Sequence, residues 1–425
     1  MAEQTNRIPY FHTQQNSPAP FLEQHIQTHH QQIEDWFSTQ WPITHAPFYS
    51  SVDCRNAGFK AAPIDTNIFP AGWNNLDPNS QSLCVNAAKA TVSQRLPNAK
   101  RLMLIPENHS RNLAYFNNVK TLQQILSLAG FEVIIGTTDP QIETTRDIQL
   151  ADNESITLHR IHRQNNTVKT ETFLPCGLIL NNDLSSGHPD ILRNLSQTIL
   201  PLTQFGWHQR LKSEHFYFYQ QAANELAQLI NIDPWLINPL FDQCPEVDFM
   251  KPEGRHCIEQ KTELLFQRIQ QKYNEHRISQ PPFIVIKADQ GTYGMAVMTI
   301  RSMDELRSLN RKQRTRMSHS KGSRMVTRAI IQEGIYSVES TDDGAATEPT
   351  VYHFGHHVVG GFYRSHPDKG SDEILNTPGM NFTPLTLVDN PNEPYPHRFY
   401  LYSVISRLAV LAAARELHAF QGDKP

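Results

Sequence analysis

The segment FIVIKADQGTYGMAVMTI places one lysine and two glycines between two apolar runs. The first run begins at Phe283 and ends in Lys287, and Gly291 and Gly294 precede a second, β-favouring run at 295–300. Glycines let backbone N–H groups come close to phosphate oxygens, and a nearby lysine adds a point charge. The pattern predicts a strand, a glycine turn and a strand, with phosphate bound at the turn. A plain surface hairpin is the alternative.

The order of elements around this turn excludes two common phosphate sites. The P-loop and the dinucleotide-binding fold both run from a strand through a glycine turn into a helix. Here a helix is predicted only near residue 303, because Ser302 and Glu305 form a capping-box pattern. No GxxxxGK[ST] motif occurs in the chain. We therefore predict a flap over the phosphates of a nucleotide.

A second strand ends about forty residues later in Gln332-Glu333-Gly334-Ile335. A nucleotide base could pair with exposed backbone at such a strand end, and Glu333 could reach amino or hydroxyl groups. An ordinary strand end is the alternative for this stretch alone. Taken together, the two elements predict a nucleotide site with phosphates at the turn and the base at the strand end.

The composition is that of an ordinary globular protein. The chain has 425 residues, of which 39% are hydrophobic and 19% charged, so it can form two or three domains. No apolar run has the length of a signal peptide core or a membrane span. No CxxC pair occurs, and we expect neither disulfides nor a zinc ribbon among Cys54, Cys84, Cys176, Cys244 and Cys257. These features predict a reduced, cytoplasmic, soluble protein; they do not indicate its oligomeric state.

Strand and helix signals alternate in the first half of the chain. RLMLIP, a helix at about 117–129 and GFEVIIGT form a β-α-β unit, and GLILNN adds a third strand. This alternation predicts a doubly wound parallel sheet with ligands at the carboxyl ends of its strands. The segment 51–76 has no sustained period and is predicted to be irregular backbone. We predict a helical leader at 1–45, an α/β substrate-binding domain at 46–240 and an α+β nucleotide-binding domain at 241–425.

The chain resembles the ATP-grasp superfamily in its glycine turn and IIQEGI strand, and over nearly its whole length it resembles the proteobacterial type of glutamate–cysteine ligase. The resemblance implies an N-terminal α/β domain followed by an ATP-grasp-like domain. It also implies ATP-dependent joining of the γ-carboxylate of L-glutamate to the amine of L-cysteine. The matching segments are SVDCRNAGFKAAPIDTNIFPAGWNNL, IPENHSRNLAYFNNV, GWHQRLKSEHF, IDPWLINP, IKADQGTYGMAVMTI, IIQEGI, VVGGFYR and LNTPGMNF.

The resemblance implies roles for single residues at the nucleotide site. Arg364, which ends VVGGFYR, is expected to face phosphates, with a solvated strand-end arginine as the alternative. The expected phosphate contacts are Lys287, Gly291, Thr292, Tyr293 and Gly294. The expected base contacts are Gln332, Glu333 and Ile335. The late E-x-N triplet that holds magnesium in ATP-grasp enzymes does not follow Asn381. Oxygen ligands suit Mg²⁺ or Mn²⁺, and our substitutes are Glu373, Asn376 and Glu348.

The segment 51–76 is expected to bind glutamate. Arg55 offers a bidentate clamp for the α-carboxylate, and Lys60 is a second cation. Asp65 is expected to hold the ammonium group, while Asn56 and Asn67 orient the two ends of the molecule. A turn-rich surface loop is the alternative. Glu107, Asn108 and His109, at a strand tip, are candidates for binding cysteine.

The chemistry agrees with these residue types. A carboxylate and an amine form an amide in water only after activation, here by phosphorylation to an acyl phosphate. Catalysis then needs alignment and charge neutralisation rather than a protein nucleophile, and the chain contains neither GxSxG nor HExxH. Another carboxylate–amine ligase, such as a glutathione synthetase, is the closest alternative.

A nucleotide- or RNA-binding protein built on an inactive ligase is the alternative from another class. The segment 307–328 contains eight Lys and Arg residues and no acid, but it lacks aromatic residues for base stacking. The net charge of −4 also disfavours generic nucleic-acid binding. We therefore expect small-molecule substrates and no nucleic-acid or membrane partner.

Overall fold

The computed structural model describes residues 8–14, 20–108, 112–150, 154–291, 295–320, 324–388 and 396–422. His109 and the turn residues Thr292, Tyr293 and Gly294 lie outside these ranges. Within them, every helix is too short or too polar to cross a membrane.

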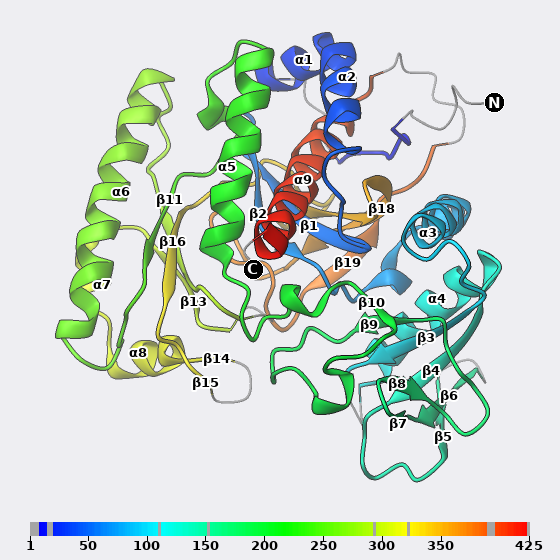
Figure 1. Ribbon diagram of the computed structural model, residues 1–425. Helices are drawn as coiled ribbons and strands as arrows, with labels where there is room; N and C mark the ends of the chain where they lie inside the picture. The colour runs from blue at the N-terminus through cyan, green and yellow to red at the C-terminus, as the bar shows by residue number, and fades with distance from the viewer. Residues whose placement is uncertain are drawn as a thin grey trace.

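The first two helices of the described chain are α1 (Phe21–Thr28) and α2 (His30–Gln40). Their apolar sides join the core around the last helix, α9 (Tyr400–Gly422), as Figure 1 shows. Two ion pairs hold the same contact, from Glu23 to Arg398 at 2.8 Å and from Glu34 to Arg407 at 2.7 Å. The two helices therefore cover the C-terminal helix rather than form a separate unit.

A six-stranded sheet confirms the predicted parallel arrangement. Its order is β10-β9-β3-β4-β6-β5, parallel except at the edge strand β5. Helices α3 and α4 share a core with one face, and α4 lies close to the expected helix at 117–129. The other face packs against loops and the end of α9, so the sheet is parallel but not doubly wound as predicted. The elements are α3 (Gln81–Arg95), β3 (Arg101–Pro106), α4 (Leu113–Leu128), β4 (Glu132–Thr137), β5 (Thr145–Gln149), β6 (Ser155–Arg160), β9 (Gly177–Asn181) and β10 (Thr198–Leu200), with a small hairpin β7 (His162–Gln164) and β8 (Thr167–Lys169).

A five-stranded antiparallel sheet, β19-β18-β17-β1-β2, corrects the prediction of irregular backbone at 51–76. All eight residues of β1 are buried, so its sequence shows no alternation of polar and apolar residues. A register shift between Asp53 and Cys54 further obscures the period. The sheet also joins residues from both sides of the boundary predicted at 240. Its strands are β1 (Tyr49–Asn56), β2 (Ala61–Asn67), β17 (Thr347–Phe354), β18 (His357–Ser365) and β19 (Asn381–Pro384).

A four-stranded antiparallel sheet, β11-β16-β12-β13, contains the predicted strand–turn–strand. Helix α7 begins at Met303, and Ser302 accepts a hydrogen bond from the N–H of Glu305, as predicted. In Figure 1 helix α5 and α9 lie between this sheet and the six-stranded one. The elements are α5 (Lys212–Leu229), β11 (Phe241–Cys244), α6 (His256–Glu275), β12 (Ile284–Ala288), β13 (Val297–Ile300), α7 (Met303–Arg307), α8 (Arg311–Ser318), β14 (His319–Ser320), β15 (Arg324–Met325) and β16 (Ala329–Glu333). Short 3-10 turns are η1 (Trp73–Asn75), η2 (Pro78–Ser80), η4 (Asp190–Leu192), η5 (Thr203–Phe205), η6 (Pro234–Ile237) and η7 (Glu253–Arg255).

The expectation that the cysteines lack partners is wrong for one pair. Cys244, at the end of β11, forms a disulfide with Cys257, near the start of α6. A spacing of thirteen residues gives no motif, and only the packing of α6 against β11 brings the two sulfur atoms together.

Candidate active site

A cavity lies between the five-stranded and four-stranded sheets, with the segment 372–376 as a further wall. Its empty volume is about 770 Å³ with the open mouth included, within the roughly 300–1,000 Å³ of small-molecule pockets. Many residues that the sequence singled out line it: Arg55, Asp65, Lys287, Gly291, Gln332, Glu333, Ile335, Glu348, Arg364, Glu373 and Asn376. The fold therefore brings together residues that are as far apart in the sequence as Arg55 and Asn376.

One end of the cavity is apolar. Val285 on β12 and Val297 and Thr299 on β13 form one wall, and Ile374 and Leu375 line the cavity as well. This apolar end of the cavity forms a slot that is bordered by the ends of strands, and such a slot suits a planar ring. Gly334, which also lines the slot, needs to be glycine because a Cβ atom there would lie 2.1 Å from the Phe283 ring.

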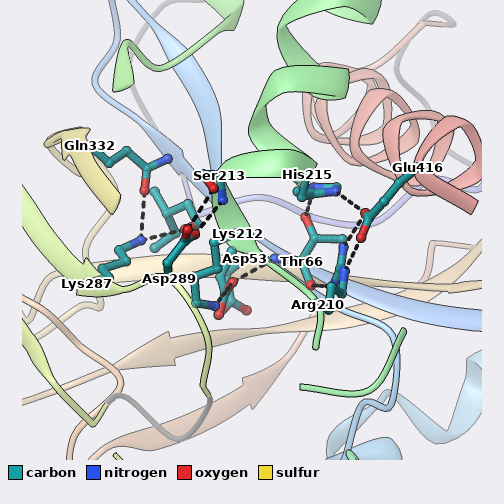
Figure 2. Close-up of polar contacts among 12 residues, drawn as sticks. Asp53, Thr66, Arg210, Lys212, Ser213, His215, Lys287, Asp289, Gln332 and Glu416 are labelled. Carbon is teal, nitrogen blue, oxygen red and sulfur yellow. Dashed lines mark hydrogen bonds and ion pairs between the residues drawn. The ribbon is translucent and has the colours of Figure 1, made fainter. Parts of the chain in front are cut away.

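Lys287 lies where the apolar and polar ends of the cavity meet. Its Nζ atom donates to the carbonyl oxygen of Ile64 at 2.7 Å and to Oε1 of Gln332 at 2.9 Å (Figure 2). Burial lowers the pKa of Lys287 to about 8, with Lys212 and Arg55 acting in the same direction and Asp65 against them. Gly291, four residues later, has a φ of +133°, which other residues rarely adopt.

Glu333 has a different position from the one predicted. Its carboxylate accepts hydrogen bonds from Lys60 at 2.7 Å, from Trp235 Nε1 at 3.0 Å and from the N–H of Leu240 at 2.8 Å. The side chains of Glu333 and Lys60 are 0% and 1% exposed. Lys60 does not line the cavity, so its predicted contact with glutamate is corrected to a buried ion pair. Only the backbone of Glu333 is left to border a ligand, because β16 packs its side chain into the core.

Four charged side chains form a chain across the five-stranded sheet. Arg55 Nε lies 2.7 Å from Glu348, the other oxygen of Glu348 lies 2.7 Å from Arg364, and Arg364 lies 2.9 Å from Asp53. Glu348 and Arg364 are direct partners on β17 and β18, which fixes their distance. Arg364 is 7% exposed, so the alternative of a solvated arginine is wrong. Burial acts to raise the pKa of Glu348, but Arg55 and Arg364 together lower it.

The guanidinium of Arg55 makes further bonds with protein. Nη1 donates to the carbonyl oxygens of Ile335 at 3.1 Å and Ser371 at 3.3 Å, and Nη2 donates to the carbonyl oxygen of Glu373. With the bond to Glu348, four of its five N–H groups have protein acceptors. Arg55 thus joins the chain just after β16 to the 371–373 segment. These contacts leave no fork for the predicted bidentate clamp on glutamate.

Two predicted orienting residues lie outside the cavity lining. Asn56 donates to the hydroxyl of Tyr402 at 3.2 Å and accepts from the N–H of Gly58 at 2.8 Å, so it shapes the turn after β1. Asn67, the last residue of β2 and two residues after Asp65, is not among the lining residues. The prediction that Asn56 contacts glutamate is therefore corrected, while the contact of Asn67 with glutamate stays a prediction. Both residues lie in segments where strand pairing, invisible in the sequence, sets the side-chain direction.

The comparisons with known proteins agree with this arrangement. The model of the glutamate–cysteine ligase family GshA matches residues 23–417. The chain belongs to the glutamate–cysteine ligase family. A crystal structure from Methylobacillus flagellatus KT, provisionally named a gamma-glutamylcysteine synthetase, has 46% sequence identity and a TM-score of 0.87. The match covers 97% of this chain and 99% of that one. A search of curated proteins gave no match.

Two further solved structures are only distantly similar to this ligase. A glutathione synthetase-like effector from Globodera pallida has 8% identity and a TM-score of 0.36, covering 80% of this chain and 77% of that one. The D-alanyl-alanine synthetase A of Vibrio cholerae has 9% identity and a TM-score of 0.34, covering 74% and 81%. Similarity at this level does not bear on the fold or activity of the ligase.

The sequence analysis missed the segment 207–215 of the ligase as part of the site. Lys212, the first residue of α5, lines the cavity with its Nζ atom 2.6 Å from Oδ1 of Asp65. Burial acts to raise the pKa of Asp65, but the ammonium groups of Lys212 and Lys287 lower it to about 2. Asp53 was missed as well, although its spacing of two from Arg55 on one strand offered a signal.

A cluster of buried polar side chains anchors this segment of the ligase to β2 and α9. Arg210 lies 2.8 Å from Glu416 on α9 and donates to the carbonyl oxygen of Thr66 at 2.8 Å. His215 contacts Glu416 at 3.3 Å and the hydroxyl of Thr66 at 2.9 Å, as Figure 2 shows. The motif GWHQRLKSEHF therefore combines a cavity residue, Lys212, with residues that anchor it to β2 and α9.

The metal ligands predicted for the ligase differ in their availability. Glu348 has both carboxylate oxygens bonded to arginines, so it does not fit a metal. Glu373, whose side chain is 35% exposed, lines the cavity together with Asn376, and its carboxylate fits a hard cation only if the cation displaces the Lys369 ammonium, which lies 3.2 Å from Oε1. Among the described residues, the one cluster with metal-like spacing is Asp233, Glu275 and His276, but Lys272 already lies within 2.9 Å of both acids.

Proposed function

We propose that this ligase binds ATP in the cavity between the two antiparallel sheets and forms γ-glutamylcysteine, ADP and phosphate through a γ-glutamyl phosphate. The proposal is supported by one observation. Lys287, Gln332 near the end of β16, and the ion pair between Arg364 and Glu348 all line the same cavity. We also propose that the four-stranded sheet and its helices form an ATP-grasp-like nucleotide-binding half, which would place the base in the apolar slot.

The proposed reaction has two chemical steps. An oxygen of the glutamate γ-carboxylate attacks the terminal phosphorus of ATP, and the bond from that phosphorus to ADP breaks. The cysteine nitrogen then attacks the acyl carbon, phosphate leaves with the electrons of the carbon–oxygen bond, and the nitrogen loses a proton. Lys287 neutralises charge on the transferring group in the first step, and the cavity walls limit access of water to the intermediate.

The polar end of the cavity is proposed to take the amino acids. It carries negative charges on Asp53, Asp65 and Glu348 and positive charges on Arg55, Lys212 and Arg364. A zwitterionic substrate requires both, and buried charges with fixed partners keep their positions when it binds. We propose small-molecule substrates as the partners of the ligase, and no nucleic acid. Because ATP and thiol substrates are available there, we propose that the ligase acts in the cytoplasm.

A divalent cation is proposed to accompany ATP. Glu373 and Asn376 would hold it, because carboxylate and amide oxygens suit Mg²⁺ and Mn²⁺ alike. When bound, the cation neutralises charge on the phosphates. The N–H of Gly370 and the ammonium of Lys369 lower the pKa of Glu373, which keeps this carboxylate ionised.

The test uses the purified protein with ATP and Mg²⁺. Phosphate should appear only when glutamate and cysteine are both present, and mass spectrometry should find γ-glutamylcysteine in equal amount. Release of phosphate with γ-glutamylcysteine and glycine instead would identify a glutathione synthetase. ATP binding without turnover, together with salt-sensitive retention on RNA, would contradict the proposal in favour of a binding protein.

A further inference from the structure

Two lysines from distant parts of the chain reach neighbouring residues of one strand. Lys287, at the end of β12, donates to the carbonyl oxygen of Ile64, and Lys212, at the start of α5, contacts the carboxylate of Asp65. Ile64 and Asp65 are consecutive on β2, and both line the cavity. The two ammonium groups are thus anchored side by side at one place in the cavity wall.

Asp289 sets the position of Lys212 relative to Lys287. It follows β12, two residues after Lys287, and its carbonyl oxygen accepts from the N–H of Lys212 at 2.9 Å. Its carboxylate accepts from the N–H and the hydroxyl of Ser213, each at 2.8 Å. Asp289 is 0% exposed, and Figure 2 shows it next to both lysines. The end of β12 and the start of α5 therefore behave as one connected unit.

The side chain of Lys212 is also held from the other side. Its Nζ atom lies 4.1 Å from the centre of the Trp207 ring, which is a favourable cation–π distance. Lys212 is only 7% exposed. A lysine that served solubility would extend into water, whereas this one is fixed between an aromatic ring, a carboxylate and the cavity.

The charges that line the cavity at this point do not cancel. Lys212, Lys287 and Asp65 line it and carry a net charge of +1, whereas the carboxylate of Asp289 is not part of the lining and bonds to Ser213. An anion would be attracted, and burial strengthens that attraction because water screens it less.

We propose that Lys212 is a second catalytic cation of the ligase, which contacts the glutamate γ-carboxylate and the phosphoryl group during the first chemical step. This inference rests on the proposed acyl-phosphate route. Lys287 stabilises the charge from the nucleotide side, while Lys212 faces the acceptor side, where the new oxygen–phosphorus bond forms. Asp65 orients Lys212 and takes no proton, since it stays ionised between the two lysines.

The test separates the first step from the second. Hydroxylamine replaces cysteine and traps an acyl phosphate as γ-glutamyl hydroxamate, which is measured by its iron(III) colour. In Lys212→Met we expect the rate of hydroxamate formation to fall about 100-fold, the usual loss when one fixed electrostatic contact to a transition state is removed. Binding of ATP, measured by calorimetry without amino acids, should change by less than about threefold. Lys212→Arg should recover part of the lost rate, because the charge is retained.

The matched control is Lys272→Met, which removes a lysine that is paired with Asp233 at 2.9 Å and does not line the cavity. It should trap hydroxamate at the wild-type rate. A Lys212→Met protein that traps hydroxamate at the wild-type rate would overturn the inference, as would a loss of ATP binding equal to the loss of rate. Absence of hydroxamate with the wild-type protein would instead refute the acyl-phosphate route itself.

Discussion

The Nζ atom of Lys287 lies 2.9 Å from Oε1 of Gln332, and this contact fixes which way the Gln332 amide faces. A lysine ammonium only donates hydrogen bonds, so the amide oxygen must point to Lys287 and the NH₂ group must point elsewhere. The two residues lie on the paired strands β12 and β16. Lys287 therefore links the phosphate side of the proposed nucleotide site to the base side.

Gln332→Glu should weaken ATP binding. The new carboxylate would pair with the Lys287 ammonium, add negative charge to a cavity that receives a polyphosphate, and remove the NH₂ donor. We expect the KM for ATP to rise at least about tenfold, which is the effect of losing roughly one hydrogen bond to a buried group. Gln243→Glu, an exposed substitution on the neighbouring strand β11, is the control. An unchanged KM for ATP would remove Gln332 from the site.

The affinity of the ligase for ATP should fall as the pH rises through about 8. The pKa of Lys287 in the free protein is about 8, because burial favours its neutral form. ATP binds the protonated form, so affinity is constant below that pH and declines above it. Calorimetry without amino acids avoids the titration of cysteine. In Lys287→Arg the decline should vanish, because arginine stays charged; a decline that persists would assign it to another group.

The two strands on either side of the glycine segment could be predicted from the sequence because their signals are local. Lys287 and Gly291 are four residues apart, and the capping box at Ser302 marks where the next helix begins. The parallel sheet followed in the same way from alternating strands and helices. Such features depend on neighbours in the chain, which a sequence displays directly.

The polar end of the cavity could not be predicted in the same way. Glu348 meets Arg55 and Arg364 only because β1, β17 and β18 are adjacent in one sheet. The direction of the Glu333 side chain depends on Lys60 and Trp235, which lie on other elements. The sequence of a fully buried strand does not alternate between polar and apolar residues. The roles of its charged residues therefore depend on which strands it pairs with.

A surface ion pair should stabilise the closed form of the nucleotide slot. Arg301, just after β13, lies 2.7 Å from Asp372 in the cavity wall, and the two side chains are 47% and 27% exposed. An exposed pair contributes only about 0.2–1 kcal/mol, so Asp372→Asn should leave the melting temperature almost unchanged. We expect its dissociation rate for ATP, measured by stopped flow, to rise severalfold and the difference to shrink in high salt.

The double variant Arg301→Asp with Asp372→Arg should restore the slow release of ATP, because it recreates the pair with reversed charges. Glu225→Gln, which breaks the exposed pair between Glu225 and Arg415, is the control and should leave ATP release unchanged. If Asp372→Asn releases ATP at the wild-type rate, the pair does not act on the slot.

Arg55→Lys should affect the nucleotide and the metal rather than glutamate alone. Lysine keeps the charge beside Glu348 but cannot bond at once to the carbonyl oxygens of Ile335, Ser371 and Glu373. The segment 371–376 then loses its anchor, and with it the placement of Glu373 and Asn376. We expect both the KM for ATP and the Mg²⁺ concentration for half-maximal activity to rise about tenfold or more, as steady-state kinetics would show. Arg160→Lys, at an arginine that also donates to two carbonyl oxygens but lies in the six-stranded sheet, should change neither. A rise confined to the KM for glutamate would instead support the carboxylate clamp.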